Sequence, residues 1–101
     1  MTAKEFRKLA LSLPEAIEAS HMGHPDFRVG GKIFATLGPK EDWGMVKLPP
    51  AEQTALVERE PDVYSSASGA WGRAGSTIIQ LALADPATVK EALKAAWEKA
   101  K

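Results

Sequence analysis

The side chains in this chain that are best suited to chemistry are cations and one tryptophan. They are Arg28, Lys32, Lys47, Arg73 and Trp71. Arginine and lysine contact phosphate oxygens, and an exposed indole can stack on a nucleobase. Such a set predicts phosphate contacts with possible stacking by the indole, which is the chemistry of nucleic-acid binding. Four or five phosphate contacts would give modest affinity that falls steeply with salt.

The charge balance of the whole chain argues against a dedicated polyanion binder. Its 101 residues contain 13 Lys plus Arg and 13 Asp plus Glu, so the formal net charge is zero. A basic surplus is the usual signature of nucleic-acid binding. The distribution is uneven, however, because residues 28–47 carry four basic and two acidic residues, whereas residues 50–62 carry one basic and four acidic residues. Any electrostatic footprint should therefore be small and should lie on the first stretch.

Catalytic and metal chemistry find little support. The chain has no cysteine, and its two histidines, His21 and His24, have only Glu18 and Asp26 nearby as further ligands, whereas a zinc site needs three or four. We interpret both imidazoles as structural hydrogen-bonding groups. The serines of residues 65–68 lack the glycine-flanked turn of a nucleophile elbow. We expect no enzyme activity, no metal and no cofactor.

A second binding hypothesis remains open. Arg28, Lys32 and Arg73 could instead meet a small anionic ligand, and the Ser/Gly-rich loop around Trp71 could form a pocket wall. A protein or peptide partner is the other alternative. Salt separates these classes, because phosphate-backbone binding weakens steeply as salt rises.

The elements that must position these residues alternate between helical and strand periodicity. Phe6, Leu9, Ala10 and Leu13 form one helical stripe, with Thr2 and Glu5 at capping-box spacing and Pro14 ending the helix. Later segments predict strands at 27–29, 32–37 and 43–48, a helix from Pro50 to about Glu60, a weak strand at 63–64, a strand at 77–83, and a helix begun by Asp85-Pro86. The order α-β-β-β-α-β-β-α predicts an α+β fold, a mainly antiparallel sheet with helices packed on it.

The first two strands should form a hairpin. Gly30-Gly31 can supply the positive φ angles of a two-residue turn. This turn would set Phe27 opposite Phe34 and place Arg28 and Lys32 on opposite faces near the tip, a β-hairpin wing. The segment from Glu15 to His24 is a connector for which the sequence pattern predicts no particular conformation. Ser65 to Gly75 is expected to be loop.

Several spaced motifs resemble the MmcQ/YjbR family. They are Ser12–Glu15, the run HMGHPDFRVGGKIFATL at 21–37, Pro61–Tyr64, Ala70–Gly72, and Ala96–Trp97. The resemblance implies a secretion-chaperone-like α+β domain and carries the family's usual label of DNA binding through paired β-hairpin wings. Gly75-Ser76 departs from the Gly-Trp of many members, so a surface built on that tryptophan should be missing.

The overall expectation is one domain over residues 1–101, a monomer in the cytoplasm. The first residues mix charges of both signs without an apolar stretch, unlike a secretory signal, and no run approaches the length of a membrane span.

Overall fold

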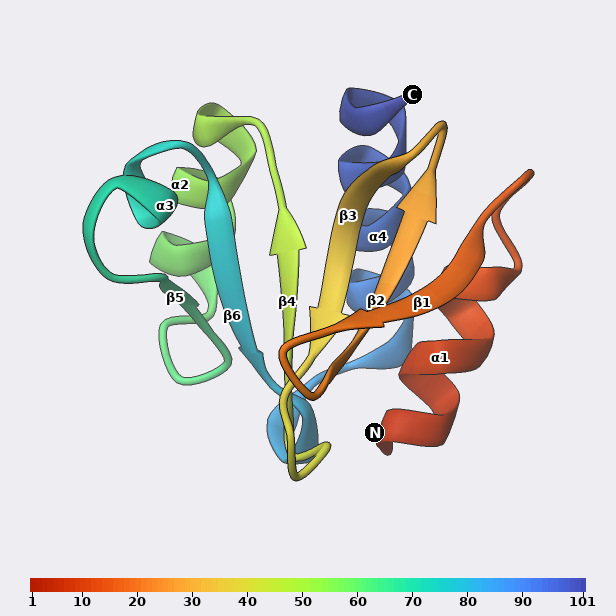
Figure 1. Ribbon diagram of the computed structural model, residues 1–101. Helices are drawn as coiled ribbons and strands as arrows, with labels where there is room; N and C mark the ends of the chain where they lie inside the picture. Colours follow the sequence, from red (N-terminus) through yellow and green to blue (C-terminus); the bar gives the residue numbers. More distant parts are fainter.

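The computed structural model describes residues 1–101 as an α+β domain (Figure 1). Its elements in chain order are α1 (Ala3–Leu11), β1 (Ile17–His21), β2 (His24–Val29), β3 (Lys32–Leu37), β4 (Trp43–Lys47), α2 (Pro50–Arg59), β5 (Tyr64–Ser66), α3 (Gly69–Arg73), β6 (Ser76–Gln80), the 3-10 helix η1 (Leu81–Leu83) and α4 (Pro86–Ala100). The longest helix, α4, has 15 residues, and none of the helices has the length and apolar character needed to cross a membrane.

A single six-stranded sheet organises the domain. Its strand order is β1-β2-β3-β4-β6-β5, and every neighbouring pair is antiparallel. Helices α2 and α4 lie behind the sheet in Figure 1, and α1 packs on the same side, with Phe6 in edge contact with Phe27. The core lies between these helices and the sheet. No long helix covers the opposite face, which we call the open face.

The predicted hairpin is confirmed, but one of its pairings is wrong. Gly30 and Gly31 have φ of 58° and 79°, which allows the two-residue turn. Val29 pairs with Lys32 and Arg28 with Ile33, and the register then shifts, so Phe27 pairs with Ala35 rather than with Phe34. The bulge lets two consecutive residues, Phe34 and Ala35, be fully buried. Because Val29 is buried, the alternation of β2 leaves Arg28 on the open face.

Three further segments differ from the sequence prediction. The connector from Glu15 to His24 contains edge strand β1, whose residues are exposed or half-exposed and therefore lack an apolar alternation. The expected loop from Ser65 to Gly75 contains the end of β5 and all of α3. A Cβ at Gly72 would collide with the carbonyl of Ala67, so this glycine permits a close backbone approach. The strand predicted at 77–83 ends at Gln80 and continues as η1.

The helix termini follow the sequence signals. Thr2 Oγ1 accepts from Glu5 N at 3.1 Å, and Glu5 Oε1 accepts from Thr2 N at 2.9 Å, which completes the capping box. Asp85 caps α4 by accepting from Thr88 N at 3.2 Å, directly before Pro86 at the first helical position. These caps fix where α1 and α4 begin.

Tyr64 is fully buried, and its hydroxyl has no hydrogen-bond partner. Burial, aided by the charge of Glu60, raises the pKa of Tyr64 to about 12. Tyr64→Phe should keep or raise the free energy of unfolding by up to about 1 kcal/mol at neutral pH, because an unsatisfied hydroxyl is removed. Urea denaturation measures this change.

The same variant should behave differently in alkali. Between the ordinary pKa of 10.0 and about 12, the unfolded wild-type chain loses the tyrosine proton while the folded chain keeps it, so the wild type loses stability as pH rises. The variant lacks this loss. A destabilised Tyr64→Phe protein at neutral pH would show that the hydroxyl has a partner after all.

Candidate functional site

Four cations from three parts of the fold line one cavity. The cavity has a volume of about 460 Å³ and lies between the β2–β3 turn, β4 and the end of α4. Its charged lining residues, here called the basic cluster, are Arg28, Lys32, Lys47 and Lys99. The remaining lining residues are uncharged: Gly31, Ile33, Ala96 and Ala100. Three of the five residues chosen from the sequence are therefore brought together.

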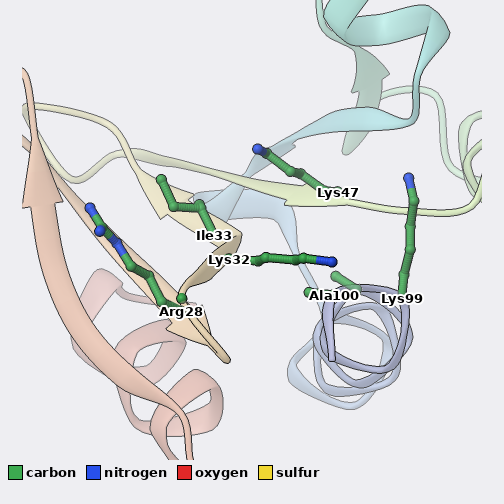
Figure 2. A pocket seen from close by; sticks show the side chains of 8 residues that line it. Arg28, Lys32, Ile33, Lys47, Lys99 and Ala100 are labelled. Carbon is green, nitrogen blue, oxygen red and sulfur yellow. The ribbon is translucent and has the colours of Figure 1, made fainter.

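The members of the basic cluster do not all point the same way (Figure 2). Lys32 extends toward Ala100 and Lys99 on α4, whereas Arg28 extends away from them, on the side of β1. Lys99 Nζ donates to the carbonyls of Leu48 at 3.1 Å and Ala74 at 3.0 Å. These bonds hold the Lys99 ammonium group beside β4. Lys99 is not among the residues predicted from the sequence, because a lysine in the last turn of a helix is common and carries no distinguishing signal.

Arg28 already forms hydrogen bonds with a residue of the same strand, Asp26. Its Nε donates to Asp26 Oδ1 at 2.7 Å and its Nη2 donates to Asp26 Oδ2 at 3.1 Å. The Asp26 side chain has no exposed surface, and His21 Nδ1 lies 2.7 Å from its Oδ2. The hydrogen bonds from Arg28, followed by that of His21, hold the pKa of Asp26 below its ordinary value. The positive charge of Arg28 is thus largely balanced within the protein.

A second cavity, here called the open-face cleft, lies on the uncovered side of the sheet. Its volume is about 430 Å³. It is lined by His21 and Met22 at the β1–β2 turn, by Ile33, Thr36, Met45 and Lys47 from β3 and β4, and by Ala67, Ser68 and Trp71 at α3. Thr36 pairs with Asp26 on one side and Met45 on the other, so the strand register places all three on this face. Ile33 and Lys47 also line the first cavity.

Trp71 lies at the edge of this cleft and is strongly exposed. It is 68% exposed, whereas every other Phe, Trp and Tyr residue is buried or half-buried. Lys47 Nζ lies 5.5 Å from the centre of its ring, within the range of a cation–π contact. Arg73 is exposed in the last turn of α3 and lines neither cavity. The structure therefore brings Trp71 to one of the predicted cations, Lys47, and leaves Arg73 outside both cavities.

The two histidines have structural contacts. His21 and His24 are a cross-strand pair whose rings stack with centroids 5.8 Å apart, and His24 also contacts the ring of Trp43 at 6.0 Å. His21 hydrogen-bonds to Asp26, as described above. No three or more His, Asp or Glu side chains are grouped to hold a metal ion. What the site offers chemically is cations beside an apolar and aromatic surface.

Asp26 should stabilise the fold through its three bonds. Asp26→Asn keeps the shape of the side chain but removes the charge that Arg28 and His21 face, so the free energy of unfolding should fall by about 2 kcal/mol at neutral pH. Because the folded pKa lies below the ordinary 3.8, this contribution is present above that value and is lost as pH falls through the folded pKa. Urea denaturation at neutral pH and about pH 3 should show the wild-type advantage shrinking in acid; an equal advantage at both pH values would contradict the assignment.

Comparison with known proteins supports the fold described above. A crystal structure of the Deinococcus radiodurans protein DR2400, described as having the domain DUF419, superimposes with a TM-score of 0.80 and 16% sequence identity. The match covers 95% of this chain and 75% of that chain. No curated protein matches the sequence. The family model YjbR matches residues 11–99, almost the whole length, and the chain therefore belongs to the YjbR family.

Proposed function

We propose that this domain binds DNA without catalysing a reaction, by contacting phosphates through the basic cluster. The observation that supports the proposal is the convergence of Lys32, Lys47 and Lys99 on one cavity that has no acidic lining residue. A neutral chain can present such a surface when its acidic residues are used elsewhere. Arg7, for example, is paired with Glu18 at 2.9 Å and with Glu41 at 3.3 Å.

Arg28 should contribute less to phosphate contact than the three lysines of the basic cluster. Lys32 and Lys47 make no salt bridge in the structure, whereas Arg28 forms two hydrogen bonds to a buried carboxylate. A phosphate that approached Arg28 would compete with Asp26. We therefore assign the main phosphate contacts to Lys32 and Lys47, with Lys99 beside them, and a smaller contribution to Arg28.

The position of the cluster suits contact with an extended backbone. Lys32 begins β3 directly after the glycine turn, Lys47 ends β4, and Lys99 lies near the end of α4. Side chains at the ends of several elements can follow successive phosphates without entering a narrow pocket. We further propose that the domain acts as a monomer in the cytoplasm, a compartment that the absence of cysteine suits.

The proposal predicts salt-dependent binding that depends on two lysines. Fluorescence anisotropy of labelled DNA, single- and double-stranded, should show affinity falling steeply with salt. The double variant Lys32→Gln/Lys47→Gln should bind several-fold more weakly at low salt. It should also make the fall of the logarithm of the binding constant with the logarithm of salt concentration less steep, by between about 1 and 2 in slope, because two phosphate contacts are lost.

A matched double variant controls for total charge. Lys90 and Lys94 are exposed on α4 and line neither the basic cavity nor the open-face cleft. Lys90→Gln/Lys94→Gln removes the same charge and should leave both affinity and slope nearly unchanged. Arg28→Gln should weaken binding less than Lys32→Gln. Absence of binding at low salt, or equal losses in the two double variants, would refute phosphate recognition by the basic cluster.

Inorganic phosphate distinguishes DNA from a small anionic ligand. A site for one small anion should be occupied by millimolar phosphate, which would then block labelled DNA at constant ionic strength. Contacts spread along a DNA backbone should be affected no more by phosphate than by chloride at that ionic strength.

A further inference from the structure

Apart from Lys47, the residues that line the open-face cleft have no role in the proposed phosphate contact, yet the cleft adjoins the basic cluster. The two cavities share Ile33 and Lys47. Because Lys47 belongs to the basic cluster and also lines the cleft, a group that lies in the cleft is next to that cluster. Whatever binds both must combine a negatively charged part with a part suited to the cleft.

The surface of the cleft is mostly apolar. Apolar or aromatic surface comes from Ile33, Met45, Met22 and Trp71. Met22 is 92% exposed and Trp71 is 68% exposed. Large apolar side chains that are left this exposed around a hollow mark a binding surface. An indole and the sulfur-containing methionine side chains suit a flat ring, because both make favourable contacts with aromatic faces.

The cleft also holds polar groups without protein partners. Thr36 is 3% exposed, and its Oγ1 is buried with no hydrogen-bond partner. Such an unmade bond is costly, and because Thr36 lines the cleft, a molecule bound there is placed to supply the missing partner. At the rim, His21 Nδ1 is used by Asp26, so Nε2 is the ring nitrogen left for another molecule. A flat ring with hydrogen-bonding edges fits these groups better than a plain hydrocarbon.

We propose that the open-face cleft holds the base of one unpaired nucleotide, while Lys47 and the rest of the basic cluster contact the adjoining phosphates. This inference rests on the proposed function and narrows it to single-stranded nucleic acid. A paired base cannot enter the cleft without leaving its stack, which has an energetic cost. Phosphates joined to bases match the charge of the basic cluster and the apolar surface of the cleft together.

Two oligomers with the same phosphates test the role of the base. Labelled oligothymidylate and an abasic oligomer of equal length are compared by fluorescence anisotropy at low salt. The wild type should bind the oligothymidylate on the order of tenfold more tightly, which is the range for stacking of one base on an aromatic side chain. It should also prefer oligothymidylate to a duplex with the same number of phosphates.

Two variants locate that preference in the cleft. Trp71→Ala should lower the affinity for oligothymidylate to about that for the abasic oligomer. Thr36→Val removes only an unpartnered hydroxyl, so it should fold normally, weaken oligothymidylate binding about fivefold, and leave abasic binding unchanged. Leu83→Ala is the matched control, because Leu83 is 62% exposed and lines neither cavity.

The outcomes separate this inference from the proposed function. If the abasic oligomer binds as tightly as oligothymidylate, or if both cleft variants keep the preference, the cleft does not hold a base, although phosphate binding stands. If neither oligomer binds at low salt, phosphate binding itself fails and the cleft proposal with it. Free thymidine monophosphate that displaces oligothymidylate only from proteins with an intact cleft would support the inference.

Discussion

The carboxylate of Asp26 has no exposed surface, and the open face of the sheet depends on how it is satisfied. It accepts two hydrogen bonds from Arg28 and lies 2.7 Å from His21 Nδ1. The bond between His21 and Asp26 joins β1 to β2 and holds His21 at the rim of the open-face cleft. The two bonds from Arg28 also balance the charge of an arginine that the sequence predicts as a phosphate contact. Our proposal consequently assigns the main phosphate contacts to the lysines around it.

One-sided packing explains why the open face has a cleft at all. The three long helices lie on the other face, where Phe6, Phe27 and Leu93 are fully buried. The open face is bordered only by the β1–β2 turn and by α3, so the strand residues between them, Thr36 and Met45, form a floor. The two neighbouring cavities meet at Ile33 and Lys47, and our proposals assign phosphate contact to one and base contact to the other.

Much of this arrangement could be predicted from the sequence, and the failures have physical causes. Paired glycines, caps and apolar stripes are local signals, so the hairpin and the long helices were predictable. The bulge that pairs Phe27 with Ala35 was not, because it depends on how Phe34 packs against the helices. The position of the glycine turn in the sequence predicts that Arg28 and Lys32 both lie near the hairpin tip. The sequence could not reveal the bond of Arg28 to Asp26 or the approach of Lys99 from α4.

The most direct test of nucleic-acid binding by this face is an NMR titration of ¹⁵N-labelled protein with a short oligothymidylate. The three tryptophan indoles serve as reporters on different parts of the molecule. Our account predicts shifts for the Trp71 indole and for the amides around Lys32 and Lys47, with little change for Trp97, whose Nε1 donates to Pro14 O at 3.0 Å beside α1. Shifts confined to the helical side, or no shifts at low salt, would contradict it.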